Sequence, residues 1–196
     1  MLINSPFYHS VSNMEVSQKT SLIISHLKDG LHFSFKCADD PFVIYNEFRE
    51  NNQPLWQQEV LEVFISAGNE ISSSYIEFQI NPNNAIFLAE INNPCLKGKN
   101  NTLKFIDPSL HSINSTANIN LDNNQWSGEF TLPFTLLGGD HYNYRMNIFR
   151  IIAEHKPTSS NWKNSVKTST YACWKPTSGL SKPSFHQPAS FASIQF

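Results

Sequence analysis

Short apolar segments separated by turn-forming residues run along most of the chain. Each segment is either apolar throughout or alternates apolar and polar positions, and Asn, Pro, Asp and Gly cluster between the segments. This pattern is typical of β-strands joined by tight turns. The strands it predicts are residues 22–26, 31–37, 60–65, 75–81, 85–91, 115–121, 126–132, 144–154, 170–174 and 191–196.

Turn residues predict how these strands connect. Three hairpins are expected, with turns at residues 28–30, 82–84 and 122–125. Residues 38–55 and 92–104 are expected to be irregular, and residues 132–138 predict one short helical turn that Gly138 ends. No segment with a 3.6-residue period is long enough for a substantial helix. With no visible repeat or linker, we expect one domain, residues 1–196, folded as an all-β, antiparallel, jelly-roll-like β-sandwich with minimal helix.

Composition supports this fold and restricts the partners. Charged residues make up 15% of the chain and aromatic residues 13%, which favours strands and leaves rings available for stacking on a ligand. The formal net charge is −2, so no basic surface for nucleic acid is expected. No apolar run approaches the ~18 residues of a membrane span, and the N-terminus has no secretion signal pattern. A cytoplasmic location is therefore expected unless an export signal was removed, and the oligomeric state stays open.

Cysteine and catalytic patterns argue against two further classes of site. Cys37, Cys95 and Cys173 are far apart and form no C-x-x-C pair, so they are expected to be buried or semi-buried thiols in a reducing compartment. The chain has no G-x-S-x-G, H-E-x-x-H or phosphate-binding glycine motif. Glu59 and Glu62 lie three apart on one predicted strand and therefore point to opposite faces, unlike the convergent carboxylates of a glycosidase. We expect no enzyme activity.

Residues 53–66, QPLWQQEVLEVFIS, combine two features that could reflect either packing or a binding site. Glu62 interrupts an otherwise apolar strand, and Trp56 lies beside a predicted turn at Pro54. Burying a lone carboxylate is unfavourable, so Glu62 must be paired or must lie in a cleft where the sheet meets solvent. In a cleft it could accept hydrogen bonds from the hydroxyl groups of a polar ligand. A structural role and a ligand-binding role are both open at this point.

Other charged residues also have two interpretations. Asp39 and Asp40 could supply oxygen ligands to a calcium ion, but Asp40-Pro41 is typical of a turn, which is the favoured interpretation. Arg145 and Arg150 lie on one long predicted strand, where pairing with carboxylates such as Glu77 or Glu154 is expected.

Several segments, in the same order, resemble family 9 carbohydrate-binding modules and the related DOMON-like β-sandwiches. Trp56 followed by VLEVFI at residues 60–65 is similar to the family's W-x-x-D-x-V-E-[IV]-F-[IV] segment. Residues 75–83, YIEFQINPN, resemble the next hairpin, and residues 126–134 and 144–150 resemble later strands. The ending WKPT at residues 174–177, with FHQPASF at residues 185–191, resembles the family's W-x-P-T … F-H-x-P-x-x-F-G ending.

The resemblance implies a β-sandwich that binds a mono- or oligosaccharide without cleaving it, often at the reducing end of a glycan. Two aromatic rings hold the sugar between them in such modules. Trp56 matches one ring, Phe185 takes the place of the second, and Glu62 matches a carboxylate that binds hydroxyls. The ligand-binding residues predicted in this way are Trp56, Glu62, Gln79, Asn81, Trp174, Phe185 and His186.

The resemblance also shows departures and alternatives. Gln79 replaces an arginine of the family, Lys182-Pro183 an asparagine pair, and Ala192 a glycine. No cofactor is expected apart from structural calcium, which family members commonly carry and for which Asp39 and Asp40 are the candidates. Trp174 could equally fill the core.

Two alternative functions stay open. One is a haem-binding DOMON-like sandwich, for which Met14 and Met146 are the available methionine ligands. The other is a divergent structural or protein-interaction domain that does not bind sugar.

Overall fold

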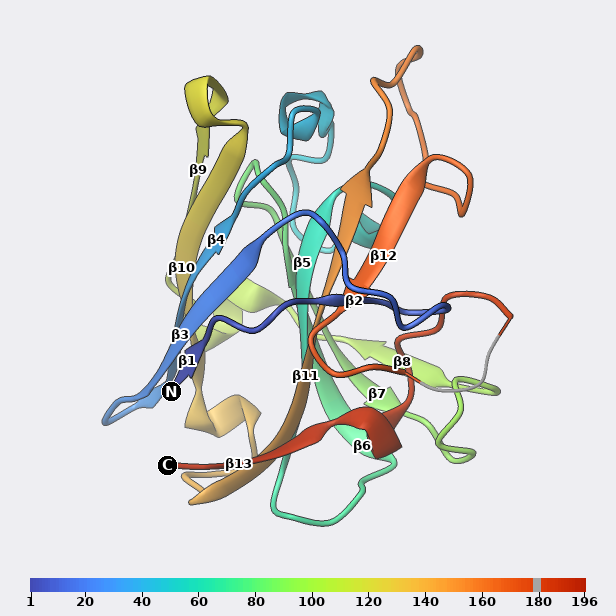
Figure 1. Cartoon of the computed structure of the whole chain (residues 1–196). Coiled ribbons are helices and arrows are strands. Elements are labelled where there is room, and N and C mark those ends of the chain that lie inside the picture. Colours follow the sequence, from blue (N-terminus) through green and yellow to red (C-terminus); the bar gives the residue numbers. More distant parts are fainter. Residues whose placement is uncertain (178–180) are drawn as a thin grey trace.

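Two antiparallel sheets face each other in the computed structural model, which describes residues 1–177 and 181–196 (Figure 1). The smaller sheet has five strands in the order β1 (Leu2–Ile3), β3 (Thr20–His26), β4 (Gly30–Cys37), β10 (Gln125–Pro133) and β9 (Ser115–Asn120). The larger sheet has the order β2 (Tyr8–His9), β12 (Ser169–Cys173), β11 (Asn143–Ala153), β5 (Val60–Ala67), β6 (Ser74–Ile80), β7 (Ile86–Asn92) and β8 (Thr102–Phe105), and β13 (Ala192–Gln195) pairs with β11. The prediction of an all-β sandwich is confirmed.

Helical structure is limited to single 3₁₀ turns. The described residues contain no α-helix, and none of their helical segments is long and apolar enough to cross a bilayer. The turns are η1 (Val43–Tyr45), η2 (Leu55–Gln57), η3 (Pro108–His111), η4 (Leu121–Asn123), η5 (Phe134–Leu136) and η6 (Pro188–Ser190). The turn expected within residues 132–138 is therefore present as η5.

All three hairpins form in the expected places, because each is encoded by a turn and the two strands beside it. β3 pairs with β4, β6 with β7, and β9 with β10. The expectation that residues 92–104 are irregular is wrong at their end, where β8 pairs with β7. Cys95, in the loop before β8, is exposed rather than buried, whereas Cys37 and Cys173 are buried as expected.

The main core fills the space between the sheets. Phe130 of β10 stacks on Phe33 of β4, with ring centroids 4.8 Å apart, and on Phe78 of β6 at 4.2 Å. Trp126 is fully buried in the same layer. Aromatic side chains from both sheets therefore hold the sandwich together.

The larger sheet also carries apolar side chains on its outer face. Strand β5 is buried along most of its length, with Leu61, Val63 and Ile65 facing the smaller sheet. The alternate residues Val60 and Phe64 belong to a second apolar cluster on the other side of the sheet. This outer cluster includes Leu55, Phe64, Tyr75, Phe87, Phe149, Ile151, Phe185 and Phe191. Chain segments outside the sheet, including η2 and residues 185–191, contribute to its cover.

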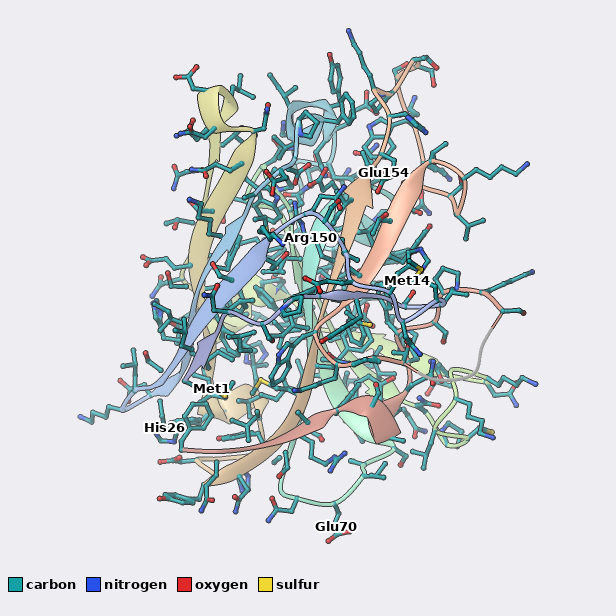
Figure 2. All side chains as sticks on the ribbon, viewed as in Figure 1. Met1, Met14, His26, Glu70, Arg150 and Glu154 are labelled. Atoms are coloured by element: carbon teal, nitrogen blue, oxygen red, sulfur yellow. The ribbon has the colours of Figure 1, made fainter. Side chains whose placement is uncertain are left out.

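A buried charged cluster lies between the sheets, where Figure 2 shows Arg150 in the middle of the molecule. Arg150 pairs with Asp40, and its Nη2 lies 3.6 Å from Glu59 Oε1. Trp126 Nε1 donates to Asp40 Oδ2 at 3.1 Å, and Arg150 Nη1 donates to Thr20 Oγ1 at 3.2 Å. Burial and the neighbouring Asp40 raise the pKa of Glu59 well above its usual range. Arg150 pairs with a carboxylate as expected, but the partner is Asp40 rather than Glu77 or Glu154, because Arg150 points to the opposite face from Glu77.

The same cluster bears on the calcium hypothesis. The carboxylate of Asp40 is fully buried and bound to Arg150, so it does not fit a calcium site shared with Asp39. Within residues 1–177 and 181–196, no three His, Cys, Asp or Glu side chains are grouped so that they could hold a metal. Calcium binding through other ligands stays an untested prediction.

Candidate functional site

A cleft of about 370 Å³ opens over the outer face of the larger sheet. Four of the residues singled out in the sequence line it together, although they are up to 130 positions apart: Trp56, Glu62, Phe185 and His186. The other lining residues are Phe64, Glu77, Leu103, Ile151, Asn164, Tyr171, Pro183 and Ser184. The strand that carries Glu62 and the two segments that carry the rings therefore meet at one place.

Trp56 lies on η2, at the edge of the cleft. Leu55 beside it is fully buried and anchors the turn, while Trp56 keeps 38% of its surface exposed. Its ring meets Phe87 edge-on, with centroids 5.0 Å apart. Asn164 ties this turn to the loop before β12, since its side chain donates to the carbonyl of Trp56 and its backbone N–H donates to that of Gln57. An aromatic surface is thus held in place and left accessible.

Phe185 lines the cleft in a different manner from Trp56. Its ring stacks on Phe149 of β11, with centroids 4.3 Å apart and planes 15° apart, and it is only 8% exposed. One face of Phe185 is therefore covered by the protein. The ring extends the apolar wall of the cleft, and Trp56 supplies more accessible aromatic surface.

Glu62 and Glu77 line the cleft from neighbouring strands. Glu62 of β5 lies directly opposite Gln79 of β6, and Glu77 is two residues away on the same face. The exposed fraction of each side chain is 4% or less. Gln79 Nε2 donates to Glu77 Oε1 at 2.6 Å. Glu62 Oε1, Glu77 Oε2 and Gln79 Oε1 are buried and have no hydrogen-bond partner among the described residues.

The surroundings make ionisation of both carboxyl groups unfavourable. Burial raises the pKa of Glu77 from its ordinary value of 4.5 to about 7, although the hydrogen bond from Gln79 lowers it in part. Burial and the adjacent charge of Glu77 raise the pKa of Glu62 well above its usual range. The two carboxyl groups therefore titrate as a pair, and a charge on Glu77 disfavours ionisation of Glu62.

His186 is held by a short hydrogen-bond chain at another part of the cleft. Its Nδ1 lies 2.8 Å from the hydroxyl of Tyr75, and that hydroxyl accepts from Asn93 Nδ2 at 3.3 Å. Asn93 Nδ2 also donates to the His186 carbonyl at 3.0 Å, and Asn93 Oδ1 accepts from the N–H of Gly98. Burial lowers the pKa of His186 to about 4, so the ring is neutral near pH 7. Donation from the Tyr75 hydroxyl to Nδ1 would place the ring proton of the neutral imidazole on Nε2.

Three other residues of the predicted set do not line the cleft. Gln79 lies outside the cleft lining and instead donates a hydrogen bond to the carboxylate of Glu77. Asn81 is fully buried and holds the β6–β7 turn, donating to Asn46 Oδ1 at 2.9 Å and to the Phe48 carbonyl at 3.0 Å. Trp174 belongs to the core between the sheets, which decides between the two roles considered for it.

Sequence reasoning missed several lining residues. Glu77 had a detectable signal, because it interrupts an apolar strand just as Glu62 does and shares a face with Gln79. Asn164 and Tyr171 had none. Tyr171 donates to Asn164 Oδ1 at 2.7 Å, and both reach the cleft through tertiary folding of a loop and a short strand.

The two methionines considered as haem ligands do not line the cleft. Met14 lies at the surface and is 70% exposed, and Met146 is buried between the sheets. The cleft lining therefore includes His186 but neither of the methionines that the haem alternative names.

Comparison with known proteins places this fold among β-sandwiches. No protein-family profile matches the chain. It is 26% identical, over 97% of its length and 84% of the other protein, to a protein of Arthroderma benhamiae named "Extracellular protein". That name gives no support to the cytoplasmic location expected from the sequence.

The similar solved structures share the fold at low sequence identity. A candidate carbohydrate-binding protein from Bacteroides uniformis has a TM-score of 0.70 and 14% identity, over 100% of this chain and 86% of the other. A family 9 carbohydrate-binding module from Caldicellulosiruptor kristjanssonii, in complex with glucose, has a TM-score of 0.55 and 13% identity, over 96% and 82%. At these identities the comparison establishes a common fold.

Proposed function

We propose that this protein is a non-catalytic carbohydrate-binding module that holds a sugar in the cleft over the outer face of its larger sheet. One observation carries the proposal: an accessible Trp56 and the unpartnered oxygens of Glu62 and Glu77 occur in the same cleft. Sugar rings present both surfaces that such a cleft would bind, because their C–H faces are apolar and their edges carry hydroxyl donors.

Each contact has a distinct role in this proposal. Trp56 packs against one face of the sugar ring, and Phe185 extends the apolar wall. Glu62 and Glu77 accept hydrogen bonds from hydroxyl groups, which gives their buried oxygens the donors that the protein does not supply. The proton on His186 Nε2 is a further donor. A few such bonds, at ~0.5–1.5 kcal/mol each, with one stacked ring correspond to roughly micromolar to millimolar affinity.

The size of the cleft favours the end of a glycan over its middle. At about 370 Å³ it lies near the lower limit of the ~300–1,000 Å³ typical of small-molecule sites. We therefore propose that it takes one or two sugar units at a chain end, including a reducing end.

The arrangement of the carboxylates favours binding over hydrolysis. Glycosidases place two carboxyl groups on either side of the scissile bond. Here Glu59 points to the opposite face from Glu62, while Glu62 and Glu77 lie beside each other on one surface. Such a pair reaches the ligand from a single side.

Substitution of Trp56 tests the proposal. We expect Trp56→Ala to weaken sugar binding at least about tenfold, as measured by calorimetry, because a stacked ring is worth ~0.5–1.5 kcal/mol beyond the area that it buries. The thermal midpoint should change little, because the side chain is already 38% exposed. Tyr142→Ala is the matched control, since Tyr142 is an exposed aromatic residue that does not line the cleft.

Two results would count against the proposal. Unchanged affinity of Trp56→Ala would remove the ring from the binding site. A screen of mono- and disaccharides in which the wild-type protein binds none of them would leave the protein-interaction alternative as the better explanation of the fold.

A further inference from the structure

The carboxylate pair in the cleft differs from the other buried carboxylates of the protein. Asp40 and Glu59 face the guanidinium of Arg150, which offsets their charge. Within the described part of the chain, Glu62 and Glu77 form no ion pair, and the residues lining the cleft include neither Lys nor Arg. Two acidic groups are therefore buried side by side without a cation from the protein.

The unpartnered atoms of this site are two carboxyl oxygens and one amide oxygen, and all three accept hydrogen bonds when the carboxyl groups are ionised. Glu62 Oε1 and Glu77 Oε2 have no donor, and neither does Gln79 Oε1 beside them. The nearby titratable groups bring no positive charge: Tyr171 comes from β12, Tyr75 from β6, and His186 is neutral near pH 7. On β11, Phe149 and Ile151 face this side of the sheet, and Arg150 between them faces the other side.

These observations define what a well-matched ligand would carry. A hydroxyl group donates one hydrogen bond and brings no charge, so it compensates the pair only in part. A primary ammonium donates three hydrogen bonds, accepts none, and carries the positive charge that the site lacks. Charge-assisted hydrogen bonds are about twice as strong as neutral ones.

We infer that the cleft prefers an amino sugar, with the ring against Trp56 and a primary ammonium group between Glu62 and Glu77. The inference rests on the proposed function and specifies the class of sugar. The ring and the charge are recognised by different residues, so the two parts can be tested separately.

Calorimetry with matched sugars near pH 7 tests this preference. D-glucosamine, D-glucose and N-acetyl-D-glucosamine differ only at one ring position, and the β-1,4-linked disaccharides of the same sugars extend the comparison to a chain end. We expect the amine to bind at least about tenfold more tightly than the neutral sugars. The N-acetyl form should lose this advantage, because its nitrogen carries no charge.

Variants of the carboxylates connect the preference to the site. Glu77→Gln keeps the shape of the side chain and should bring the ratio of glucosamine to glucose affinity close to one. Glu62→Gln should act in the same direction and serves if Glu77→Gln fails to fold. Glu90→Gln is the control, because Glu90 is an exposed carboxylate of β7 outside the cleft, and it should keep the wild-type ratio.

The outcomes separate this inference from the proposed function. Neutral sugars that bind as tightly as glucosamine would overturn the inference and leave the sugar-binding proposal standing. An amine preference that survives in both glutamine variants would also overturn it. Failure of every sugar to bind would overturn the proposed function, and the inference with it.

Discussion

At the scale of single residues, Glu77 links the cleft to the stability of the fold. Its pKa is raised from 4.5 to about 7 by burial, so the folded protein holds a proton that the unfolded chain releases earlier. Between these two values the folded state binds more protons, and stability therefore falls as the pH rises. Glu62, whose pKa is raised in the same direction, adds to this effect.

We expect the free energy of unfolding to decrease from about pH 4.5 to about pH 7, by an amount of order 3 kcal/mol for a shift of this size. Urea unfolding at several pH values measures the slope. Glu77→Gln should flatten it, since the glutamine does not titrate and no longer disfavours ionisation of Glu62. Equal slopes for wild type and Glu77→Gln would contradict the assignment, and Glu90→Gln should match wild type.

The ion pair of Arg150 with Asp40 has a structural role that does not depend on the cleft. Arg150→Met leaves Asp40 buried without its partner, so we expect a loss of about 3–5 kcal/mol in the free energy of unfolding. Denaturant unfolding measures this loss, and adding Asp40→Asn should recover part of it. A loss below about 1 kcal/mol would show that the pair is dispensable. Sugar affinity of the folded variant should be retained, because Arg150 faces away from the cleft.

Residue patterns in the sequence predicted some of the cleft-lining residues and missed others. Trp56 and Glu62 stood out because each conflicts with its local environment, an exposed ring beside a turn and a carboxylate in an apolar strand. Asn81 and Trp174 were chosen through matching motifs, and here they hold a turn and fill the core. Asn164 and Tyr171 could not be found, since only the tertiary fold brings them to the cleft.

At the scale of elements, the well-predicted strands are those whose partner is next in sequence. The β3–β4, β6–β7 and β9–β10 hairpins each carry their turn and both strands in one short segment. The two-residue strands β1 and β2 pair with β3 and β12, neither of which is the next strand in sequence. Both strands are too short to show an alternation of polar and apolar residues. The four residues of β8, TLKF, do alternate polar and apolar positions, but so short a run beside a polar loop gives only a weak strand signal.

Close packing between strands β9, β10 and β4 leads to a prediction about Gly128. A methyl group there would lie 2.0 Å from the Thr116 carbonyl oxygen and 2.9 Å from a ring carbon of Phe35. We therefore expect Gly128→Ala to destabilise the protein by about 1–3 kcal/mol in urea unfolding. Ser127→Ala, one residue away and facing outward, should have little effect, and equal stability of the two variants would contradict this packing argument.

At the scale of the whole molecule, the larger sheet has apolar side chains on both faces, and the two faces have different uses. The inner face forms the core with the smaller sheet. The outer face carries the second apolar cluster, and the cleft opens within the segments that cover it. This is why Glu62 can be nearly buried and still line the cleft.

The distribution of the three cysteines gives the molecule a ready attachment point for a reporter group. Burial raises the pKa of Cys37 to about 12 and that of Cys173 to about 11, so these thiols are poor nucleophiles. Cys95 alone is exposed, in the loop that Asn93 ties to His186 at the cleft. A thiol-reactive dye added to the unmodified protein is therefore directed to one position beside the candidate binding site. A fluorescent dye at Cys95 would therefore serve as a reporter of ligand binding without an engineered cysteine.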